Sequence, residues 1–403
     1  MKLYKKILLI LVLIIIYTYV CNISMLPNSI ILMQGETLNL NTIFGLNVTS
    51  SETMQASSNL NNSIVEDTGT MDLSLDLFNL FSVKDVTVNV IPKTTVIPMG
   101  KAIGMKLYTE GVLVVGMSEI QGQKPYEGSG IETGDMIVEI NNEPINSTDE
   151  LIECVNRSNG ESLEIKYISN EEEKTTSIAP AKDSDNEYKL GLWVRDAAAG
   201  VGTLTFYEPS TGNFAALGHG INDVDTYDLI QIANGELVTT NILDIVKGED
   251  GSPGEIRGSI ENGTTLGKVS KNTALGIYGN ITDVSRLNIS TAKEMEVANR
   301  SEITTGKAEI MCELENGKIQ NYEIEIQKIF IDNNENNKSM LIKVTDEELI
   351  EKTGGIIQGM SGAPIIQNGK FIGAVTHVLV NDSKTGYAVF ADMMIKQMRE
   401  VSE

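Results

Sequence analysis

Short stretches of alternating apolar and polar residues dominate the chain after its N-terminal segment. Val-Thr-Val-Asn-Val at 86–90 and Leu-Glu-Ile-Lys-Tyr-Ile at 163–168 both alternate with a period of two. A third stretch, 371–380, has strand character and follows an Asn-Gly pair that is typical of a hairpin turn. Successive side chains of a strand point to opposite faces of a sheet, so this period indicates strands with one buried face. The pattern predicts a mainly β protein.

The first 20 residues have a different pattern. Lys2, Lys5 and Lys6 precede a predominantly apolar run at 7–20. Positive charges stay on the cytoplasmic side of a membrane, so this pattern predicts export of everything that follows. The run is shorter than the roughly 20 residues that cross a bilayer, which favours a cleaved signal peptide. No small-residue cleavage motif follows it, however, so residues 1–21 are expected to be a signal peptide or membrane anchor, with the anchor preferred.

The length and charge of the chain limit its organisation and its partners. A chain of 403 residues can form two or three cores, since single domains usually hold about 100 to 200 residues. Residues 22–95 are rich in Asn, Ser and Thr and are expected to form a small β-rich spacer before two further domains, at 96–182 and 183–403. The formal net charge of −24 argues against nucleic acid as a partner, because phosphate contacts require positive charge.

The three cysteines carry no predicted chemistry. Cys21, Cys154 and Cys312 are too few and too scattered for a disulfide framework, and they lack the spacing of a zinc site. Cys21 as a lipid-modified residue is a minor alternative, because the residues just before it are not small. No metal or other cofactor is expected.

The middle of the chain combines a Gly-Asp turn, an alternating strand and a second turn at 130–145. Ser147 and Glu150 have the spacing of a capping box and are predicted to open a helix, after which the strand at 163–168 follows. This small α+β pattern resembles a PDZ domain. Such a domain binds an extended peptide by adding it as a strand to the edge of a sheet.

A PDZ domain also needs a loop that holds the terminal carboxylate of its peptide. The glycine-bearing segment 100–107 resembles this loop, whose exposed backbone N–H groups suit an anion. The peptide-binding residues that the resemblance implies are Ile103, Gly104, Met105 and Leu107. Peptide tails are therefore expected partners.

Only two histidines are present, so a mechanism with an imidazole base must use His219 or His377. His219 lies in a loop of small residues, 214–220, with a glycine on either side. The candidate nucleophile is Ser361, in a Gly-Met-Ser-Gly loop. A serine hydroxyl needs an adjacent base and donors for the tetrahedral oxyanion. The backbone N–H groups of Gly359 and Ser361 are predicted to form this oxyanion hole.

The Asn-Gly turn at 368–369 helps to choose between the two histidines. If the pairing that this turn starts continues without interruption, Ser361 lies opposite Thr376. His377 then faces away from the serine, which favours His219 as the base, although a bulge would shift the register. Thr376 is expected to support the triad with its hydroxyl, and His377 to be structural or to line the substrate site.

The third member of a triad must be a carboxylate that orients the histidine. Asp223, Asp225 and Asp346 are all candidates, and spacing alone does not choose among them. Asp223 and Asp225 lie close to His219 in sequence, which raises the alternative of a metal site. That alternative is set aside because the cluster lacks other ligands.

Several segments carry a resemblance to a known family. They are 191–207, 216–219, 343–346, 354–369 and 373–378. Together they closely resemble the stage IV sporulation protein B (SpoIVB) peptidases, and the likeness extends from about residue 84 to the end. The resemblance implies a PDZ domain at 96–182, a chymotrypsin-like double β-barrel serine peptidase at 183–403, and a triad of His219, Asp346 and Ser361.

The resemblance also implies a function. Members of the family are secreted from the forespore into the space between its two membranes, where they cleave themselves and a membrane-bound regulatory protein. That cleavage relieves the inhibition of an intramembrane metalloprotease and leads to activation of a late sigma factor. The expected partners are therefore this protein substrate, the chain itself by autocleavage, peptide tails through the PDZ domain, and the membrane through the N-terminal segment.

Three other interpretations are less favoured than this peptidase. A degradative periplasmic PDZ protease is one of them, but such enzymes carry the PDZ domain after the protease domain, and here it comes first. An α/β-hydrolase is disfavoured because Ala363 breaks the G-x-S-x-G motif and little chain follows the serine. The remaining alternative is a membrane-tethered PDZ adaptor whose protease-like domain is inactive. The presence of both His219 and Ser361 favours the enzyme.

Overall fold

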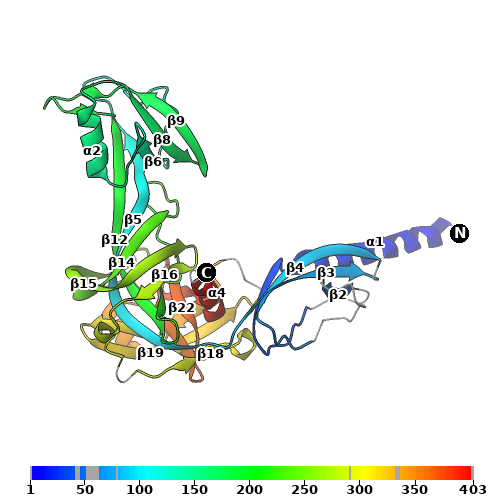
Figure 1. The fold of residues 1–403 in the computed structure, drawn as a ribbon. Helices are drawn as coiled ribbons and strands as arrows, with labels where there is room; N and C mark the ends of the chain where they lie inside the picture. The colour runs from blue at the N-terminus through cyan, green and yellow to red at the C-terminus, as the bar shows by residue number, and fades with distance from the viewer. Residues whose placement is uncertain are drawn as a thin grey trace.

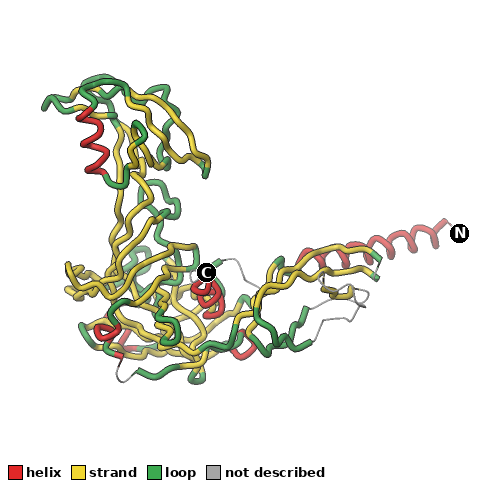
Figure 2. The backbone as a smooth tube through the Cα atoms, in the orientation of Figure 1, coloured by secondary structure: helices red, strands yellow, loops and turns green. Residues whose placement is uncertain are grey.

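The computed structural model describes residues 2–40, 46–50, 63–78, 80–289, 292–331 and 336–400. Strands make up most of the chain, as the alternating pattern predicts, and helices are few (Figure 2). Three bodies can be followed in Figure 1: the N-terminal part, the part around helix α2 and the part that carries the C-terminus.

The N-terminal helix α1 (Lys2–Met25) contains an apolar stretch of 22 residues, Tyr4–Met25, that is long and apolar enough to cross a membrane. This stretch is longer than the run at 7–20 because the helix continues to Met25. None of its most apolar window is buried against the rest of the protein. By length and composition it fits either a signal sequence or a membrane anchor.

A four-stranded sheet follows α1, in the order β1-β4-β3-β2. Its strands are β1 (Ser29–Met33), β2 (Leu46–Ser50), β3 (Gly69–Leu77) and β4 (Phe81–Ile91). The first and last of them are parallel and the others antiparallel. The alternating residues Val86, Val88 and Val90 are all buried in its core, as their period predicts.

Six strands close into a first barrel. They are β5 (Thr95–Met117), β12 (Leu192–Glu208), β13 (Asn213–Ala216), β14 (Ile232–Val246), β15 (Glu255–Thr273) and β16 (Gly276–Ile281). They pair in the order β12-β13-β16-β15-β14-β5, and the pairing of β12 with β5 closes the ring. Its core is formed by aromatic and aliphatic side chains such as Met105, Leu204 and Phe214.

Six further strands close a second barrel, in the order β18-β19-β20-β23-β22-β21. They are β18 (Gly306–Glu315), β19 (Lys318–Ile329), β20 (Met340–Val344), β21 (Pro364–Gln367), β22 (Lys370–Leu379) and β23 (Asp382–Phe390). Helix α3 (Glu347–Thr353) follows β20, and helix α4 (Ala391–Arg399) ends the described chain. The two barrels confirm the predicted chymotrypsin-like fold class.

The third body contains the PDZ elements. They are β6 (Met136–Ile140), β7 (Glu143–Pro144), α2 (Thr148–Arg157), β8 (Leu163–Ser169), β9 (Glu172–Ile178), β10 (Ala181–Lys182) and β11 (Tyr188–Lys189). The predicted cap is confirmed, because the Ser147 hydroxyl accepts the N–H of Glu150 at 3.2 Å. The Glu150 carboxylate accepts the N–H of Asn146 at 2.7 Å, one residue earlier than in a standard capping box.

Two long strands belong to both the PDZ body and the first barrel. The end of β5 contributes Val112 and Val114 to the PDZ core, and its start contributes Ile103 and Met105 to the barrel core. Strand β12 pairs with β5 along almost its whole length, from Leu192 to Tyr207. The division of the chain at residues 96 and 183 stays a prediction, and these strands join the two bodies without a flexible linker.

Candidate active site

The loop that carries His219 lies between β13 and β14 and turns sharply just before the histidine. Leu217 and Gly218 both have positive φ, +69° and +72°. A β-carbon on Gly218 would lie 3.1 Å from side-chain atoms of Thr376 and Val389, which belong to the second barrel. The histidine loop of the first barrel therefore packs directly against β22 and β23 of the second.

The loop that carries Ser361 lies between α3 and β21 and contacts the histidine loop through backbone atoms. Gly362 has a φ of +94°, and a β-carbon there would lie 2.3 Å from the Thr203 carbonyl oxygen and 2.5 Å from the Leu217 nitrogen. Only glycine fits between these groups. The structure thus brings the loops of His219 and Ser361 together where the two barrels meet.

Thr203 on β12 links both loops and was not predicted from the sequence. Its N–H donates to the Ser361 carbonyl at 3.1 Å, and its carbonyl accepts the N–H of Leu217 at 3.2 Å. Its hydroxyl donates to the Gly359 carbonyl at 2.7 Å. The side chain is almost fully buried, at 2% exposure. In the sequence Thr203 is one β-branched residue among others in a strand, so no local signal marks this role.

The predicted oxyanion hole has two backbone donors without a competing acceptor. In the described part of the chain, no hydrogen bond is formed by the N–H groups of Gly359 or Ser361. Gly359 has a φ of +96°, and a β-carbon there would lie 2.9 Å from the Ile256 side chain. The glycine therefore permits a turn that leaves these donors available for a negatively charged oxygen.

The ring of His219 is held by its own loop. Its Nδ1 lies 2.8 Å from the Gly220 carbonyl oxygen, which can only accept, so Nδ1 carries the proton in this contact and Nε2 has the free lone pair. Burial lowers the pKa of His219, and the Gly220 hydrogen bond opposes this shift. The net direction is downward, so the imidazole is neutral near pH 7, as a general base requires.

His377 lies closer to the site than the uninterrupted register predicts. The ring centroids of His377 and His219 are 5.0 Å apart. Strands β21 and β22 carry a bulge between Ile365 and Ile366, which shifts the pairing that begins at the hairpin turn. Burial, the neighbouring His219 and Lys338 lower the pKa of His377 to about 4. His377 is therefore a neutral neighbour of His219, and the uninterrupted register on which its predicted orientation depended is wrong.

The hydroxyl of Ser361 is directed to a backbone group. It donates to the Thr376 carbonyl at 2.9 Å, and no hydrogen bond joins the described side chains of Ser361 and His219. The Thr376 hydroxyl in turn donates to the Asn337 carbonyl at 2.9 Å. Thr376 is thus beside the serine as predicted, but it contacts the serine through its carbonyl and not through its hydroxyl.

Asp346 does not contact His219 in this structure. It is the N-cap residue of α3, and its carboxylate accepts the N–H groups of Leu349 at 3.0 Å and Glu323 at 3.2 Å. Both oxygens are therefore occupied by backbone donors of the second barrel. The role of Asp346 in a triad, which the family resemblance implies, stays a prediction.

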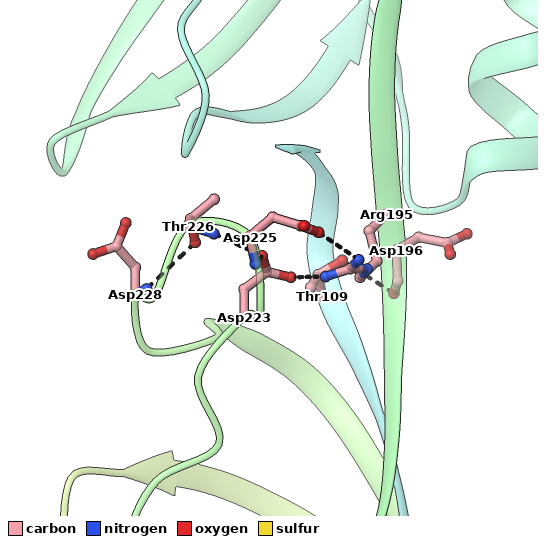
Figure 3. A network of polar contacts seen from close by, with 7 residues as sticks. All are labelled: Thr109, Arg195, Asp196, Asp223, Asp225, Thr226 and Asp228. Atoms are coloured by element: carbon pink, nitrogen blue, oxygen red, sulfur yellow. Dashed lines mark hydrogen bonds and ion pairs between the residues drawn. The ribbon is translucent and has the colours of Figure 1, made fainter. Parts of the chain in front are cut away.

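The other two carboxylates near His219 in sequence bind a guanidinium. Asp223 and Asp225 both form ion pairs with Arg195 of β12 (Figure 3). This pairing accounts for the cluster that raised the alternative of a metal site.

The predicted carboxylate-binding residues of the PDZ domain are wrong. Ile103, Gly104, Met105 and Leu107 lie in the middle of β5, where one edge pairs with β12 and the other with β14. The three apolar side chains are at most 1% exposed and belong to the core of the first barrel. Because both edges of the strand are used, its backbone cannot receive a peptide.

A different strand edge lies beside the PDZ helix. Over 192–196, β12 pairs with β5 on one side, and no described strand pairs with its other side. The start of α2 is fixed to this segment, since the Thr148 N–H donates to the Asp196 carboxylate at 2.7 Å. Trp193, the single tryptophan of the chain, is 64% exposed here. This edge has the geometry required for addition of a peptide strand.

Comparison with known protein families gives two matches. The family model for SpoIVB peptidase S55 matches residues 186–395, just over half of the 403 residues, and a PDZ domain model matches 99–179. Both predicted domain types are thereby confirmed.

Three solved structures illustrate the more distant similarity. The PDZ domain of an SdrC-like protein from Listeria monocytogenes is 21% identical, with 21% of this chain and 87% of that chain covered and a TM-score of 0.19. The active form of the Rv3671c protease from M. tuberculosis is 13% identical, with 51% and 74% covered and a TM-score of 0.30. The HtrA-type protease AlgW is 12% identical, with 55% and 58% covered and a TM-score of 0.29.

The hydroxyl of Thr203 is expected to support the oxyanion hole by fixing Gly359. Thr203→Val keeps the shape of the side chain but removes this hydrogen bond, and we expect labelling of Ser361 by a fluorophosphonate to slow about fivefold, for a loss of about 1 kcal/mol. Thr203→Ser retains a hydroxyl and is the matched control. Labelling of the valine variant at the wild-type rate would show that the bond is not used in the reaction.

The pH dependence of labelling should report the protonation of His219. Because burial lowers the pKa of His219 from its usual 6.5, the neutral base persists to a lower pH than for an exposed histidine. The rate is therefore expected to be constant near pH 7 and to fall on the acid side with a midpoint below 6.5. A midpoint above this value would mean that the site stabilises the imidazolium instead.

Proposed function

The chain belongs to the SpoIVB peptidase S55 family, and we propose that it is a membrane-tethered endopeptidase of a sporulation signalling cascade. Membership of the family makes it a serine endopeptidase that carries a PDZ domain. The proposed substrates are the chain itself and a membrane-bound regulator of an intramembrane metalloprotease. Cleavage of that regulator would trigger intramembrane proteolysis and activation of a late sigma factor.

The convergence of the loops of His219 and Ser361 beside two free backbone donors is the observation that supports a peptidase reaction most directly. In the proposed mechanism the Ser361 hydroxyl turns from the Thr376 carbonyl to Nε2 of His219 and attacks the scissile carbonyl carbon. Nε2 takes the hydroxyl proton, and the N–H groups of Gly359 and Ser361 stabilise the oxyanion.

Collapse of the tetrahedral intermediate breaks the peptide bond, and the departing amine takes the proton from Nε2 of His219. The acyl group stays on the Ser361 oxygen as an ester. Water, deprotonated by the same nitrogen, then hydrolyses this ester and restores the serine. Throughout, the Gly220 carbonyl holds Nδ1–H and keeps the other ring nitrogen available as the base.

The N-terminal helix and the charge pattern before it support export and anchoring. The apolar stretch Tyr4–Met25 would hold the chain in a membrane, with the sheet β1-β4-β3-β2 between the helix and the barrels (Figure 1). We place the enzyme outside the cytoplasm, in the space between the two membranes of the forespore, as family membership suggests. Peptide tails would add to the free edge of β12 beside α2.

The proposal is tested on the full chain in detergent, as wild type and as Ser361→Ala. We expect the wild type to react covalently with a fluorophosphonate and to yield defined fragments by intact mass over time. The alanine variant lacks the attacking oxygen, so it should show neither result. Fragmentation of both proteins at the same rate would point to a contaminating protease.

An inactive PDZ adaptor is the second candidate function. The Ser361 hydroxyl is bound to a backbone carbonyl, and among the described residues no carboxylate contacts His219, which is what an idle site would show. If the wild type is neither labelled nor cleaved, the adaptor replaces the enzyme. Quenching of Trp193 fluorescence by a peptide with a free apolar C-terminus would then show that the PDZ edge still binds.

Asp346 has two roles that can be separated by substitution. Asparagine caps a helix as well as aspartate does, whereas Asp346→Ala should lower the free energy of unfolding by about 1 kcal/mol. Asp346→Asn keeps the cap to the Leu349 N–H but replaces the second oxygen by a donor, so the Glu323 N–H loses its acceptor and the free energy of unfolding should fall by about 1 kcal/mol. If Asp346 only caps α3, Asp346→Asn should still keep the labelling rate of the wild type. If it orients His219 during the reaction, Asp346→Asn should slow labelling by up to about four orders of magnitude. Melting temperature and labelling rate together decide between the two roles.

A further inference from the structure

We propose that Arg195 is a positioning residue for the catalytic histidine, because it ties the loop that follows His219 to the strand on which the PDZ domain is built. The expected effect on the reaction rate rests on the proposed function. The effect of Arg195 on the position of His219 can be tested without any reaction. Through Arg195, the PDZ body would fix the position of the loop that orients His219.

One guanidinium binds two carboxylates of the histidine loop. The Nη1 of Arg195 contacts Oδ2 of Asp223, and its Nη2 lies 2.7 Å from Oδ2 of Asp225 (Figure 3). The planar fork of an arginine fixes the orientation of both partners, which a lysine cannot do. The loop is therefore held in one place relative to β12.

Asp223 is the part of this contact that organises the loop. Its side chain is 1% exposed, and its Oδ1 accepts the N–H groups of Asp225 at 2.9 Å and Thr226 at 3.1 Å. Burial acts to raise the pKa of Asp223, but these two N–H groups and Arg195 outweigh it, so the carboxylate stays ionised. Without Arg195 a buried negative charge would lose its cation, and the loop would have to rearrange.

Hydrogen bonds within the loop connect Asp223 to the residues beside His219. The Asp223 N–H donates to the Asp228 carbonyl at 2.9 Å, and the Ile230 N–H donates to the Ile221 carbonyl at 3.1 Å, so both sides of the loop are joined. Ile221 directly follows Gly220, whose carbonyl binds Nδ1 of His219. A displacement of the loop therefore changes the acceptor that orients the ring.

On the PDZ side the contact is continuous with α2. Arg195 pairs through its backbone with Leu113 of β5, and the next residue, Asp196, accepts the Thr148 N–H at the start of the helix. The Asp196 carbonyl also accepts the Thr109 hydroxyl at 3.1 Å. A peptide that adds to this edge of β12 would act on the same strand that carries the guanidinium.

The test uses the only two histidines of the chain as probes. In the full chain in detergent, labelled with ¹³C at the imidazole Cε1, His377→Gln assigns the two signals by elimination, and pH titration gives the pKa of His219. The ionisable side chain beside His219 is His377 on β22, whose own pKa is lowered in part by Lys338. Both residues are unchanged in all Arg195 variants, so a shift of the His219 titration reports the loop.

We expect Arg195→Gln to shift the pKa of His219, because a loosened loop changes both contributions to it: water reaches the ring, and the Gly220 carbonyl no longer holds Nδ1–H in place. Fluorophosphonate labelling of Ser361 should slow by at least about tenfold, since small displacements of catalytic groups cost much rate. Arg195→Lys should recover part of both effects. Asp225→Asn is the matched control, because that carboxylate is 47% exposed and removing its charge should change the rate less than threefold, or about 0.6 kcal/mol or less.

An Arg195→Gln protein with the wild-type titration of His219 and the wild-type labelling rate would overturn the inference. If Arg195→Gln does not fold, as judged by its melting curve, the same two readouts on Arg195→Lys decide. If the wild type is not labelled at all, the proposed function fails, and the NMR titration alone then decides whether Arg195 positions the ring.

Discussion

The catalytic geometry depends on direct backbone contact between two loops that come from different barrels. The N–H of Thr203 donates to the Ser361 carbonyl, and its hydroxyl donates to the Gly359 carbonyl of the same loop. Its own carbonyl accepts the N–H of Leu217 in the histidine loop. Gly362 permits this because a β-carbon there would overlap both the Thr203 carbonyl and the Leu217 nitrogen. Hydrogen bonds of this kind have narrow distance limits, so they fix the two barrels relative to each other more tightly than apolar packing would.

Among the described residues, the proposed base and the proposed oxyanion donors are free of competing acceptors or donors, but the proposed nucleophile is bound to a carbonyl. His219 is neutral with its Nε2 available, and the N–H groups of the oxyanion hole have no acceptor in the described chain, whereas the serine hydroxyl is held by a carbonyl. In the proposed mechanism the hydroxyl leaves this carbonyl before it reacts. Catalytic hydrogen bonds are often incomplete without substrate, so this state is compatible with an enzyme at rest.

The sequence predicted what depends on local pattern and failed where a role depends on distant partners. The helix cap at Ser147, the alternating core valines of β4 and the meeting of the loops of His219 and Ser361 were all accessible from pattern or from the scarcity of histidine. The segment 100–107 was misread because an exposed glycine loop and a buried strand have the same residues. Only its pairing with β14, more than a hundred residues later, decides between them.

The same limit applies to Thr203 and Arg195. Their partners lie far along the chain, so no sequence motif marks either residue. Both residues stand on β12, one in the barrel and one in the PDZ body. Strand β12 runs without a break from Arg195 to Thr203, although its pairing with β5 shifts register between Arg195 and Ala197. The strand that would receive a peptide at 192–196 is therefore also the strand that contacts both loops. Arg195 binds the histidine loop, and Thr203 binds the serine loop. The PDZ body and the first barrel share β5 and β12, so a peptide bound at 192–196 would lie on the strand whose side chains contact both loops.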